Sequence, residues 1–406
     1  MSSADNSLLK EEPIVLEELT SDGEASGLEV EKVDIQEGPE AAIRVPFDPS
    51  KIDVITQART VDLLLTRLKE QELDLSPDFQ RRDNIWDEKR KSSLIESMLL
   101  RIPIPSLYVS EDKDGNYTVV DGLQRLCAIA HFVDVAALNK AVNGSLNPLR
   151  LTGLQSLLDH KDKSFAELPR PLQRRIKETE LTLHIIRAST PKAVKFNIFS
   201  RINQGGLPLT AQEIRNAIYG EGQWRARVRR LAESAEFLTA TEHKVKLERM
   251  EDIELVLRFV ALYTFDSKRP DDQNLDDFLN ETVERRSIVW DDGRWTDIET
   301  SFYRALAASS QVFGKVAFRK YFGPNQSRRP INRGLFETET VLLARRSPAD
   351  LKVLASRSDG LLEKVAVLFN TNSDFINATL YATGRGSSSN KRLDILDNAL
   401  TEVLNA

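Results

Sequence analysis

Five consecutive residues, Asp121-Gly122-Leu123-Gln124-Arg125, combine groups that phosphate chemistry requires, at a point where the sequence predicts a strand running into a helix. Gly122 would let the backbone approach a ligand closely, and the free N–H groups of a helix N-terminus attract phosphate. Arg125 would add a guanidinium, and Asp121 would bind Mg²⁺, a ribose hydroxyl or an attacking water. The alternative is a tight strand-to-helix turn in which Arg125 forms an ion pair with Asp121.

A second group of polar residues lies in the irregular stretch at 76–82, where Gln80, Arg81 and Arg82 follow Phe79 and precede Trp86. Adjacent arginines in a loop beside an aromatic residue are typical of a second phosphate clamp or of a nucleic-acid contact. The alternative is a solvated loop whose two aromatic residues are held at the core. The residue types alone favour neither interpretation.

The third candidate region joins two expected helices. Arg201 and Asn203 stand at the end of the first helix, where polar side chains can project into a cleft. Gly205-Gly206 ends that helix, and the capping box Thr210-Ala-Gln-Glu213 opens the next one. A plain turn between two helices is the alternative interpretation.

The sequence lacks the residues that several other kinds of active site require. The single cysteine, Cys127, falls in an apolar run and is expected to be a buried thiol rather than a nucleophile. Neither G-x-x-x-x-G-K-[ST] nor G-x-S-x-G occurs, and none of the four histidines has the neighbours of a metal ligand or of an HNH-type nuclease site. The sequence therefore contains no recognisable DNA-cleaving centre.

The elements around these residues predict two folded regions. Apolar runs indicate strands at 52–56, 106–110, 117–120 and 181–187, with a hairpin-type turn at Asp114-Gly115-Asn116 and a helical insertion at 134–180. Farther along, the apolar period predicts helices at 224–237, 253–265, 276–289, 297–313, 338–345 and 361–369. We therefore expect an α+β domain at about 43–220 and a helical domain at about 221–406.

The charge is unevenly distributed along the chain. The 406 residues carry a formal net charge of −6, but residues 1–42 hold twelve acidic and two basic residues, so the rest carries +4. We expect residues 1–42 to be a disordered acidic tail, because their apolar surface is too small to offset chain entropy. Such a tail would compete for a basic surface as a built-in polyanion. Basic stretches in the helical half indicate contacts with a phosphate backbone or, alternatively, solvated helix faces.

The chain contains no run of about 18 uncharged apolar residues, which a membrane-spanning helix requires. Its N-terminus also lacks the basic and apolar regions of a secretory signal. We therefore expect a cytoplasmic protein without membrane contact.

Taken in order, the three candidate regions resemble a known family. Pro77-Asp-Phe-Gln-Arg81, Asp121-Gly-Leu-Gln-Arg125 and the run from Phe199 to Asn216 are similar to motifs of the GmrSD restriction-endonuclease N-terminal domain family, in the ParB/sulfiredoxin-like superfamily. The likeness covers about residues 50–220. The family's usual core is Asp-Gly-Gln-Gln-Arg, and Leu123 replaces its first Gln here. No histidine has the proline three residues on that marks the family's HNH-like nuclease half, so we expect a stand-alone member without that domain.

The resemblance implies a ParB-like fold, a small mixed sheet with helices, followed by a mainly helical C-terminal domain. It further implies a nucleotide-binding regulatory protein of a bacterial modification-dependent restriction or anti-phage defence system, with a nucleoside triphosphate (NTP) and Mg²⁺ as ligands. Asp121, Gln124 and Arg125 would then be the catalytic residues, with Asp121 as the Mg²⁺ ligand. The expected nucleotide contacts come from the other motif residues: Gln80, Arg81, Gly122, Arg201 and Asn203.

The expected partners are an NTP, DNA and a separate HNH-type nuclease subunit. Whether the NTP is hydrolysed or only bound, and whether the protein is a homo-oligomer, stay open at this point. The alternative hypothesis is a non-catalytic DNA- or protein-binding adaptor in which the Asp121–Arg125 loop is structural.

Overall fold

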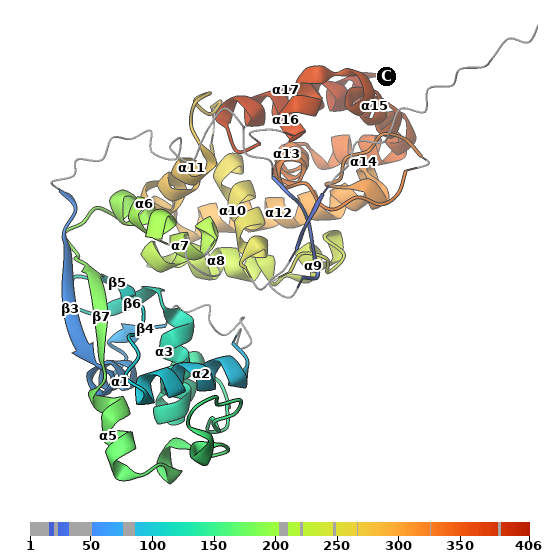
Figure 1. Ribbon diagram of the computed structural model, residues 1–406. Coiled ribbons are helices and arrows are strands. Elements are labelled where there is room, and N and C mark those ends of the chain that lie inside the picture. The colour runs from blue at the N-terminus through green and yellow to red at the C-terminus, as the bar shows by residue number, and fades with distance from the viewer. Residues whose placement is uncertain are drawn as a thin grey trace, which may run out of the picture. The chain divides into compact units, whose positions relative to one another are not determined.

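The computed structural model describes the chain at residues 16–19, 23–31, 51–75, 86–202, 210–219, 222–246, 249–265, 267–324, 326–380 and 383–406. The chain forms two compact units, which we call the sheet unit and the helical unit (Figure 1). The sheet unit takes in Pro39–Arg225 and Leu247–Met250, and the helical unit takes in Met1–Gly38, Ala226–Lys246 and Glu251–Ala406. The helical unit is therefore assembled from both ends of the chain, with the sheet unit inserted between them.

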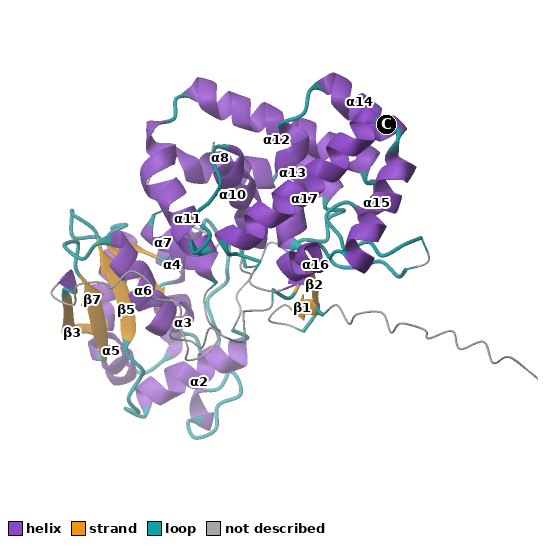
Figure 2. Ribbon diagram, turned by 90° about the horizontal axis from the view of Figure 1, so that it is seen from above, coloured by secondary structure: helices purple, strands orange, loops and turns teal. Residues whose placement is uncertain are grey.

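A mixed sheet of five strands is the centre of the described part of the sheet unit, in the order β3-β7-β5-β6-β4. Antiparallel pairing joins β3 to β7 and β5 to β6, whereas β5 with β7 and β4 with β6 run parallel. Figure 2 shows the neighbouring strands β3, β7 and β5 in orange. The strands span Val54–Thr60 (β3), Leu73–Asp74 (β4), Leu107–Glu111 (β5), Tyr117–Asp121 (β6) and Glu180–Ile186 (β7). The expected hairpin and the strand at 181–187 are confirmed to within one residue at each end.

Local capping signals start several helices around this sheet. The Thr60 side chain accepts a hydrogen bond from Leu63 N at the start of α1, and Asp87 accepts one from Arg90 N at the start of α2. The buried residues of α1 follow helical spacing and face the core. The helices of this unit span Val61–Lys69 (α1), Glu88–Leu99 (α2), Leu123–Val133 (α3), Val135–Val142 (α4), Arg170–Glu178 (α5), Lys192–Ile202 (α6) and Ala211–Ile218 (α7).

The insertion expected to be helical at 134–180 is helical mainly at its two ends, in α4 and α5. Between them the chain forms only the short 3-10 turns Leu158–His160 and Phe165–Glu167. Gly144, Pro148 and Gly153 lie in this stretch, and glycine and proline both interrupt helices. The prediction was wrong for the middle of the insertion.

Two buried polar groups lie in the core between α2 and α3. Lys91 Nζ lies 3.3 Å from Nδ1 of His131, whose Nε2 lies 2.8 Å from the carbonyl oxygen of Asn147. A carbonyl accepts only, so Nε2 carries the ring proton and Nδ1 accepts from Lys91. Burial lowers the pKa of Lys91. Cys127, on α3, is buried as expected, and burial raises the pKa of its thiol to about 12.

The helical unit packs around a cluster of phenylalanines. Phe237, Phe259, Phe302 and Phe336 are all fully buried, with ring centroids 4.7 to 6.4 Å apart in the contacting pairs. The helices span Gln223–Ala232 (α8, which begins in the sheet unit), Ala235–Ala240 (α9), Glu251–Tyr263 (α10), Leu275–Glu281 (α11), Asp292–Val312 (α12), Arg333–Ala344 (α13), Pro348–Ser356 (α14), Ser358–Thr371 (α15), Ser373–Leu380 (α16) and Gly386–Asn405 (α17). Together the two units confirm the α+β class, with a small mixed sheet and a mainly helical C-terminal region.

Two features of the helical unit differ from the sequence-based expectation. The helix predicted at 224–237 is two helices, because the Ser234 side chain caps a new one at Phe237 N. The long helix α17 was not predicted, since its first turns are rich in glycine and serine. None of the helices in the described ranges is long and apolar enough to cross a membrane.

The N-terminal region is the largest departure from expectation. Strands β1 (Glu17–Leu19) and β2 (Ala25–Glu29) form an antiparallel pair, and Leu28 of β2 is fully buried in the helical unit. The prediction of a disordered tail was therefore wrong for residues 16–19 and 23–31. Composition predicts disorder because it counts acidic charges as unpaired, whereas these meet cations from residues more than 200 positions away.

Candidate functional site

The junction between β6 and α3 is a turn that only glycine can make. Asp121 ends β6, Gly122 has φ of 91°, and Leu123 begins α3. A Cβ atom built on Gly122 would lie 2.1 Å from Cδ2 of Leu107, which is buried with 1% exposure. The group that Gly122 approaches closely in this structure is the core of the sheet unit.

The first turn of α3 leaves backbone N–H groups available. No side chain caps this helix, and its first internal hydrogen bond runs from Leu126 N to Gly122 O at 3.0 Å. The amides of residues 123–125 therefore have no acceptor among the described residues, as at any uncapped helix start. Such amides, with the positive end of the helix dipole, form an anion-binding geometry.

Arg125 is held by the protein itself. Its Nη2 donates to Oδ2 of Asp121 at 2.7 Å, and its Nη1 donates to the carbonyl oxygens of Pro105 and Ser106 at 2.6 and 3.0 Å. The Arg125 side chain is 14% exposed and that of Asp121 is 28% exposed. This is the ion-paired turn that the sequence left open as an alternative, and it places the guanidinium charge beside the helix N-terminus with its terminal nitrogens engaged.

Gln124 differs from Arg125 because its side chain has an unused donor. The Nε2 atom of Gln124 is buried and has no hydrogen-bond partner in the described structure. A buried amide without a partner costs about 1–3 kcal/mol, so its retention calls for an explanation. Leu123, where the related motif has glutamine, instead packs against the apolar core of the sheet unit.

The remaining predicted residues are not gathered with this group. Arg201 is exposed in the last turn of α6, and within the described ranges no hydrogen bond or ion pair joins it to Asp121. Arg201 is near the C-terminal end of α6, whereas Lys192 begins this helix. The Nζ atom of Lys192 lies 5.7 Å from the ring of Tyr219, the residue that follows α7. Gln80, Arg81 and Asn203 lie outside the residues that the structure describes.

The second half of the third motif region is structural. Gln212, Arg215 and Asn216 of α7 are all buried. Arg215 Nη1 donates to Gln212 Oε1 at 2.6 Å, and Gln212 Nε2 donates to Asn216 Oδ1 at 2.9 Å. The capping box is confirmed, since Thr210 accepts from Glu213 N and Glu213 accepts from Thr210 N. These hydrogen bonds fix the side chains of α7, and Asn216 also lines a polar cavity.

A polar cavity of about 510 Å³ lies elsewhere in the sheet unit, and the sequence did not indicate it. It is lined by the turn between β5 and β6, by the start of α6 and by the end of α7. Because Glu111 pairs with Tyr117 and Tyr108 pairs with Asp121, this cavity is at the opposite end of the β5–β6 hairpin from Asp121. Lys195 is already bonded there to Ser110 Oγ and Glu111 O, both at 3.0 Å.

A metal at Asp121 would have one carboxylate from this chain in the described structure. The described residues contain no group of three or more His, Cys, Asp or Glu side chains that could hold a metal ion. Mg²⁺ commonly binds through one or two carboxylates plus substrate phosphates, so Asp121 fits only a metal delivered with a nucleotide. The uncapped start of α3 and the Gln124 amide, which has no partner among the described residues, fit a phosphate group.

Comparison with known proteins agrees with the motif order. Residues 63–220 match the model of the GmrSD restriction endonuclease N-terminal domain, a span that includes the β6–α3 turn and the helix pair α6–α7. No curated protein and no solved structure shows significant similarity to the chain. Through residues 63–220, the chain is similar to the GmrSD restriction endonuclease N-terminal domain family.

Proposed function

We propose that the sheet unit binds a nucleoside triphosphate at the β6–α3 turn and acts as a regulatory module in a modification-dependent restriction or anti-phage defence system. The family associates the chain with restriction. The observation that carries the nucleotide proposal is that Gln124, in the first turn of the uncapped helix α3, has a buried Nε2 atom without a partner among the described residues. A phosphate oxygen is an acceptor for both kinds of donor.

Each residue of the turn has a role in this proposal. The amides of residues 123–125 hold a phosphate, and Gln124 donates its Nε2 hydrogens to it. Asp121 has an Oδ1 atom that makes no hydrogen bond with the described residues, and this oxygen holds Mg²⁺ or a water. Arg125 is a positioning residue, since its Nη atoms orient Asp121 and the backbone of Pro105 while its charge favours an anion nearby.

Mg²⁺, when bound, supplies positive charge that stabilises the phosphate oxygens and a water of lowered pKa. The chain lacks the first glutamine of the usual family core, so binding without rapid hydrolysis is the outcome we expect. Gln80, Arg81, Arg201 and Asn203 stay proposed nucleotide contacts. A separate HNH-type nuclease subunit and DNA are the proposed partners of the nucleotide-bound form.

The rival function, a non-catalytic DNA- or protein-binding adaptor, has one observation in its favour. The engagement of Arg125 by three protein oxygens is what a purely structural turn requires. The adaptor hypothesis expects no nucleotide effect and DNA retention that weakens steeply with salt.

A thermal-shift panel of the four NTPs with Mg²⁺ separates the two functions. The nucleotide proposal expects an upward shift in melting temperature that saturates with concentration for at least one NTP. Release of inorganic phosphate, followed in parallel, decides between binding and hydrolysis. If all four NTPs leave the melting temperature unchanged while salt-sensitive DNA binding is found, the adaptor function replaces the proposal.

A further inference from the structure

The N-terminal hairpin, which we define as the described residues 16–19 and 23–31, contacts the helical unit through main-chain hydrogen bonds of the kind that join two strands. Glu29 N donates to Ile331 O at 2.8 Å, and Ile331 N donates to Gly27 O at 2.9 Å. On the other side, Lys246 N donates to Ser26 O at 3.3 Å. This pattern is how proteins recognise an extended peptide, with backbone bonds for affinity and side chains for specificity.

Two residues of β2 give this contact its shape specificity. Gly27 has φ of 82°, and a Cβ atom on it would lie 2.2 Å from the carbonyl oxygen of Lys244. Leu28, the next residue, is fully buried. A larger residue at position 27 would have to displace backbone, so the contact selects a glycine followed by an apolar side chain.

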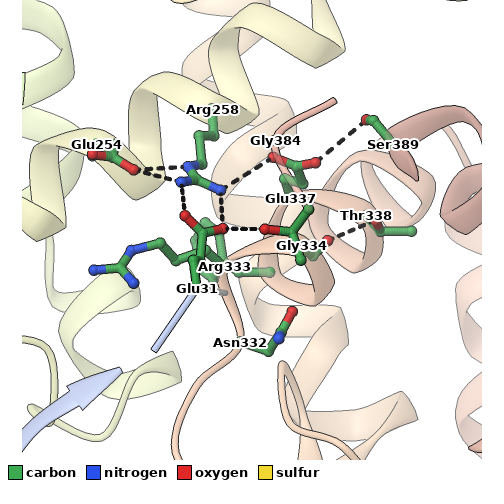
Figure 3. Close-up of polar contacts among 12 residues, drawn as sticks. Glu31, Glu254, Arg258, Asn332, Arg333, Gly334, Glu337, Thr338, Gly384 and Ser389 are labelled. Atoms are coloured by element: carbon green, nitrogen blue, oxygen red, sulfur yellow. Dashed lines mark hydrogen bonds and ion pairs between the residues drawn. The ribbon is translucent and has the colours of Figure 1, made fainter. Parts of the chain in front are cut away.

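Three glutamates of the hairpin then meet three buried cations of the helical unit. Glu31 accepts from both Nη atoms of Arg258, at 2.9 and 2.7 Å (Figure 3). Glu18 accepts in the same two-point way from Arg333, at 2.8 and 2.7 Å. Glu29 pairs with Lys320 and also accepts a hydrogen bond from Asn332 Nδ2 at 3.0 Å. These hydrogen bonds are of the strong, charge-assisted kind. They make the contact specific for acidic side chains at these positions.

The two arginines would each keep a carboxylate partner if the hairpin moved away. Glu254, on the same helix as Arg258, accepts from it at 2.6 Å, and Glu337 lies 3.9 Å from it (Figure 3). Glu251 lies 3.8 Å from Arg333. Breaking a buried pair is costly chiefly when one charge loses every partner. Here both arginines keep a second carboxylate.

The hairpin has little apolar surface to fix it in place. Leu28 is the one fully buried apolar side chain in its described residues, whereas Leu16 and Leu19 are 54% and 69% exposed. The side chains of Glu18 and Glu31 are 27% and 29% exposed, so water and salt reach these two carboxylates although Arg333 and Arg258 are buried. A contact that depends on charge more than on apolar burial weakens with ionic strength.

We propose that Lys246, Arg258, Lys320, Ile331, Asn332 and Arg333 form a docking face for an acidic strand with a Gly-Leu-Glu core, and that the N-terminal hairpin occupies it reversibly. The hairpin is a latch: it opens and closes while the helices beneath it stay folded. Because the sheet unit lies between the hairpin and the rest of the helical unit in the chain, docking closes a covalent loop through the sheet unit. This inference is independent of the proposed nucleotide site.

Hydrogen exchange on the full-length protein tests the latch directly. The amide of Glu29 is expected to exchange through local opening, with protection falling at least about tenfold between 0.05 and 1 M NaCl. Protection in α10 and α13 is expected to stay unchanged over the same range. If Glu29 and α13 exchange together at one free energy, in either salt, the hairpin is an integral part of the unit and the proposal is overturned.

Two glycines of the hairpin offer a matched pair of variants. Gly27→Ala is expected to release the hairpin, seen as loss of protection at Glu29, without loss of the cooperative melting of the helices. Gly23→Ala also places alanine at positive φ, 80°, but in open space, and is expected to leave Glu29 protected. Equal behaviour of the two variants contradicts the shape specificity that the proposal requires.

A peptide of residues 16–31 then tests the docking face itself. It should bind to the full-length Gly27→Ala protein, whose face is vacated, and not to the wild-type protein. A peptide with Glu18→Gln and Glu31→Gln should bind at least about tenfold more weakly, because two charged hydrogen-bonded pairs are lost. No binding to a folded Gly27→Ala protein at millimolar peptide would overturn the proposal, and the hydrogen-exchange result stands should that variant not fold.

Discussion

The carboxylate of Asp121 and the guanidinium of Arg125, one helical turn apart, are joined at 2.7 Å across the start of α3. The pair ties the end of β6 to the helix, and Arg125 extends the tie to the backbone of residues 105 and 106. The Asp121–Arg125 motif, which the sequence pattern associates with phosphate binding, therefore also has a structural role. The neighbouring residue Gln124 has a buried Nε2 atom without a partner among the described residues, and the first predictions separate the structural role from the binding role.

Gly122→Ala should destabilise the sheet unit by about 2–4 kcal/mol, because the new Cβ overlaps buried Leu107 and the positive φ is strained. Gly115→Ala is the control, since Gly115 has a φ of 82° but open space around it. That variant should lose only about 1 kcal/mol. Urea unfolding of the two variants measures both values, and equal losses would show that the close approach has no energetic effect.

Gln124→Ala should leave the free protein as stable as the wild type, to within about 1 kcal/mol, because the lost amide nitrogen has no partner. Under the nucleotide proposal the same variant should weaken NTP binding by about 1–3 kcal/mol, roughly 5- to 150-fold. Calorimetric titration with the NTP selected by thermal shift gives the affinity. Lys192→Ala, in the polar cavity at the other end of the β5–β6 hairpin, is the control and should bind normally. If only the Lys192→Ala variant binds the NTP more weakly, the nucleotide site is the polar cavity and not the β6–α3 turn.

Cys127 should be inert in the folded protein. It is 2% exposed, and with its thiol pKa raised to about 12 by burial the reactive thiolate is scarce at pH 8. A chromogenic disulfide reagent at pH 8 should report less than about 0.1 thiol per chain within minutes in buffer, and one thiol per chain in 6 M guanidinium. Rapid reaction of the native protein would contradict the buried position.

Glu96 should support stability in a pH-dependent way. Burial alone would raise its pKa, but backbone N–H donors from Gln155, Leu157 and Ser156 outweigh burial and lower the pKa below its usual 4.5. A lowered folded pKa means that the stabilisation is complete above pH 4.5 and is lost as the pH falls through the folded value.

Glu96→Gln should therefore cost about 1–2 kcal/mol at pH 7, and the difference from wild type should shrink below pH 4.5. Urea unfolding at pH 7 and in steps from pH 5 to pH 3 measures this difference. Glu70→Gln, at an exposed position after α1, is the control and should show neither effect. A difference that stays constant with pH would mean that the amide hydrogen bonds do not depend on the charge of Glu96.

The sequence by itself determined those features that depend on near neighbours. The Thr210–Glu213 capping box starts a helix where predicted, the β5–β6 hairpin turns at Gly115 as expected, and Thr60 and Asp87 cap the helices that follow them. In each case the side chain or glycine acts on residues within four positions of itself. The local sequence pattern is therefore sufficient to predict the helix start or the turn. The family motifs are recognisable for the same reason, because they are short and ordered.

Only the tertiary structure decided which charged side chains are paired and which groups pair with them. Arg125 is engaged by carbonyls 19 and 20 residues away, and the acidic segment at 16–31 finds its counter-charges on helices more than 200 residues along the chain. Composition treats such charges as solvated and predicts disorder. Whether a carboxylate or guanidinium is free or paired depends on what folding brings within about 3 Å of it, and no local pattern contains that distance.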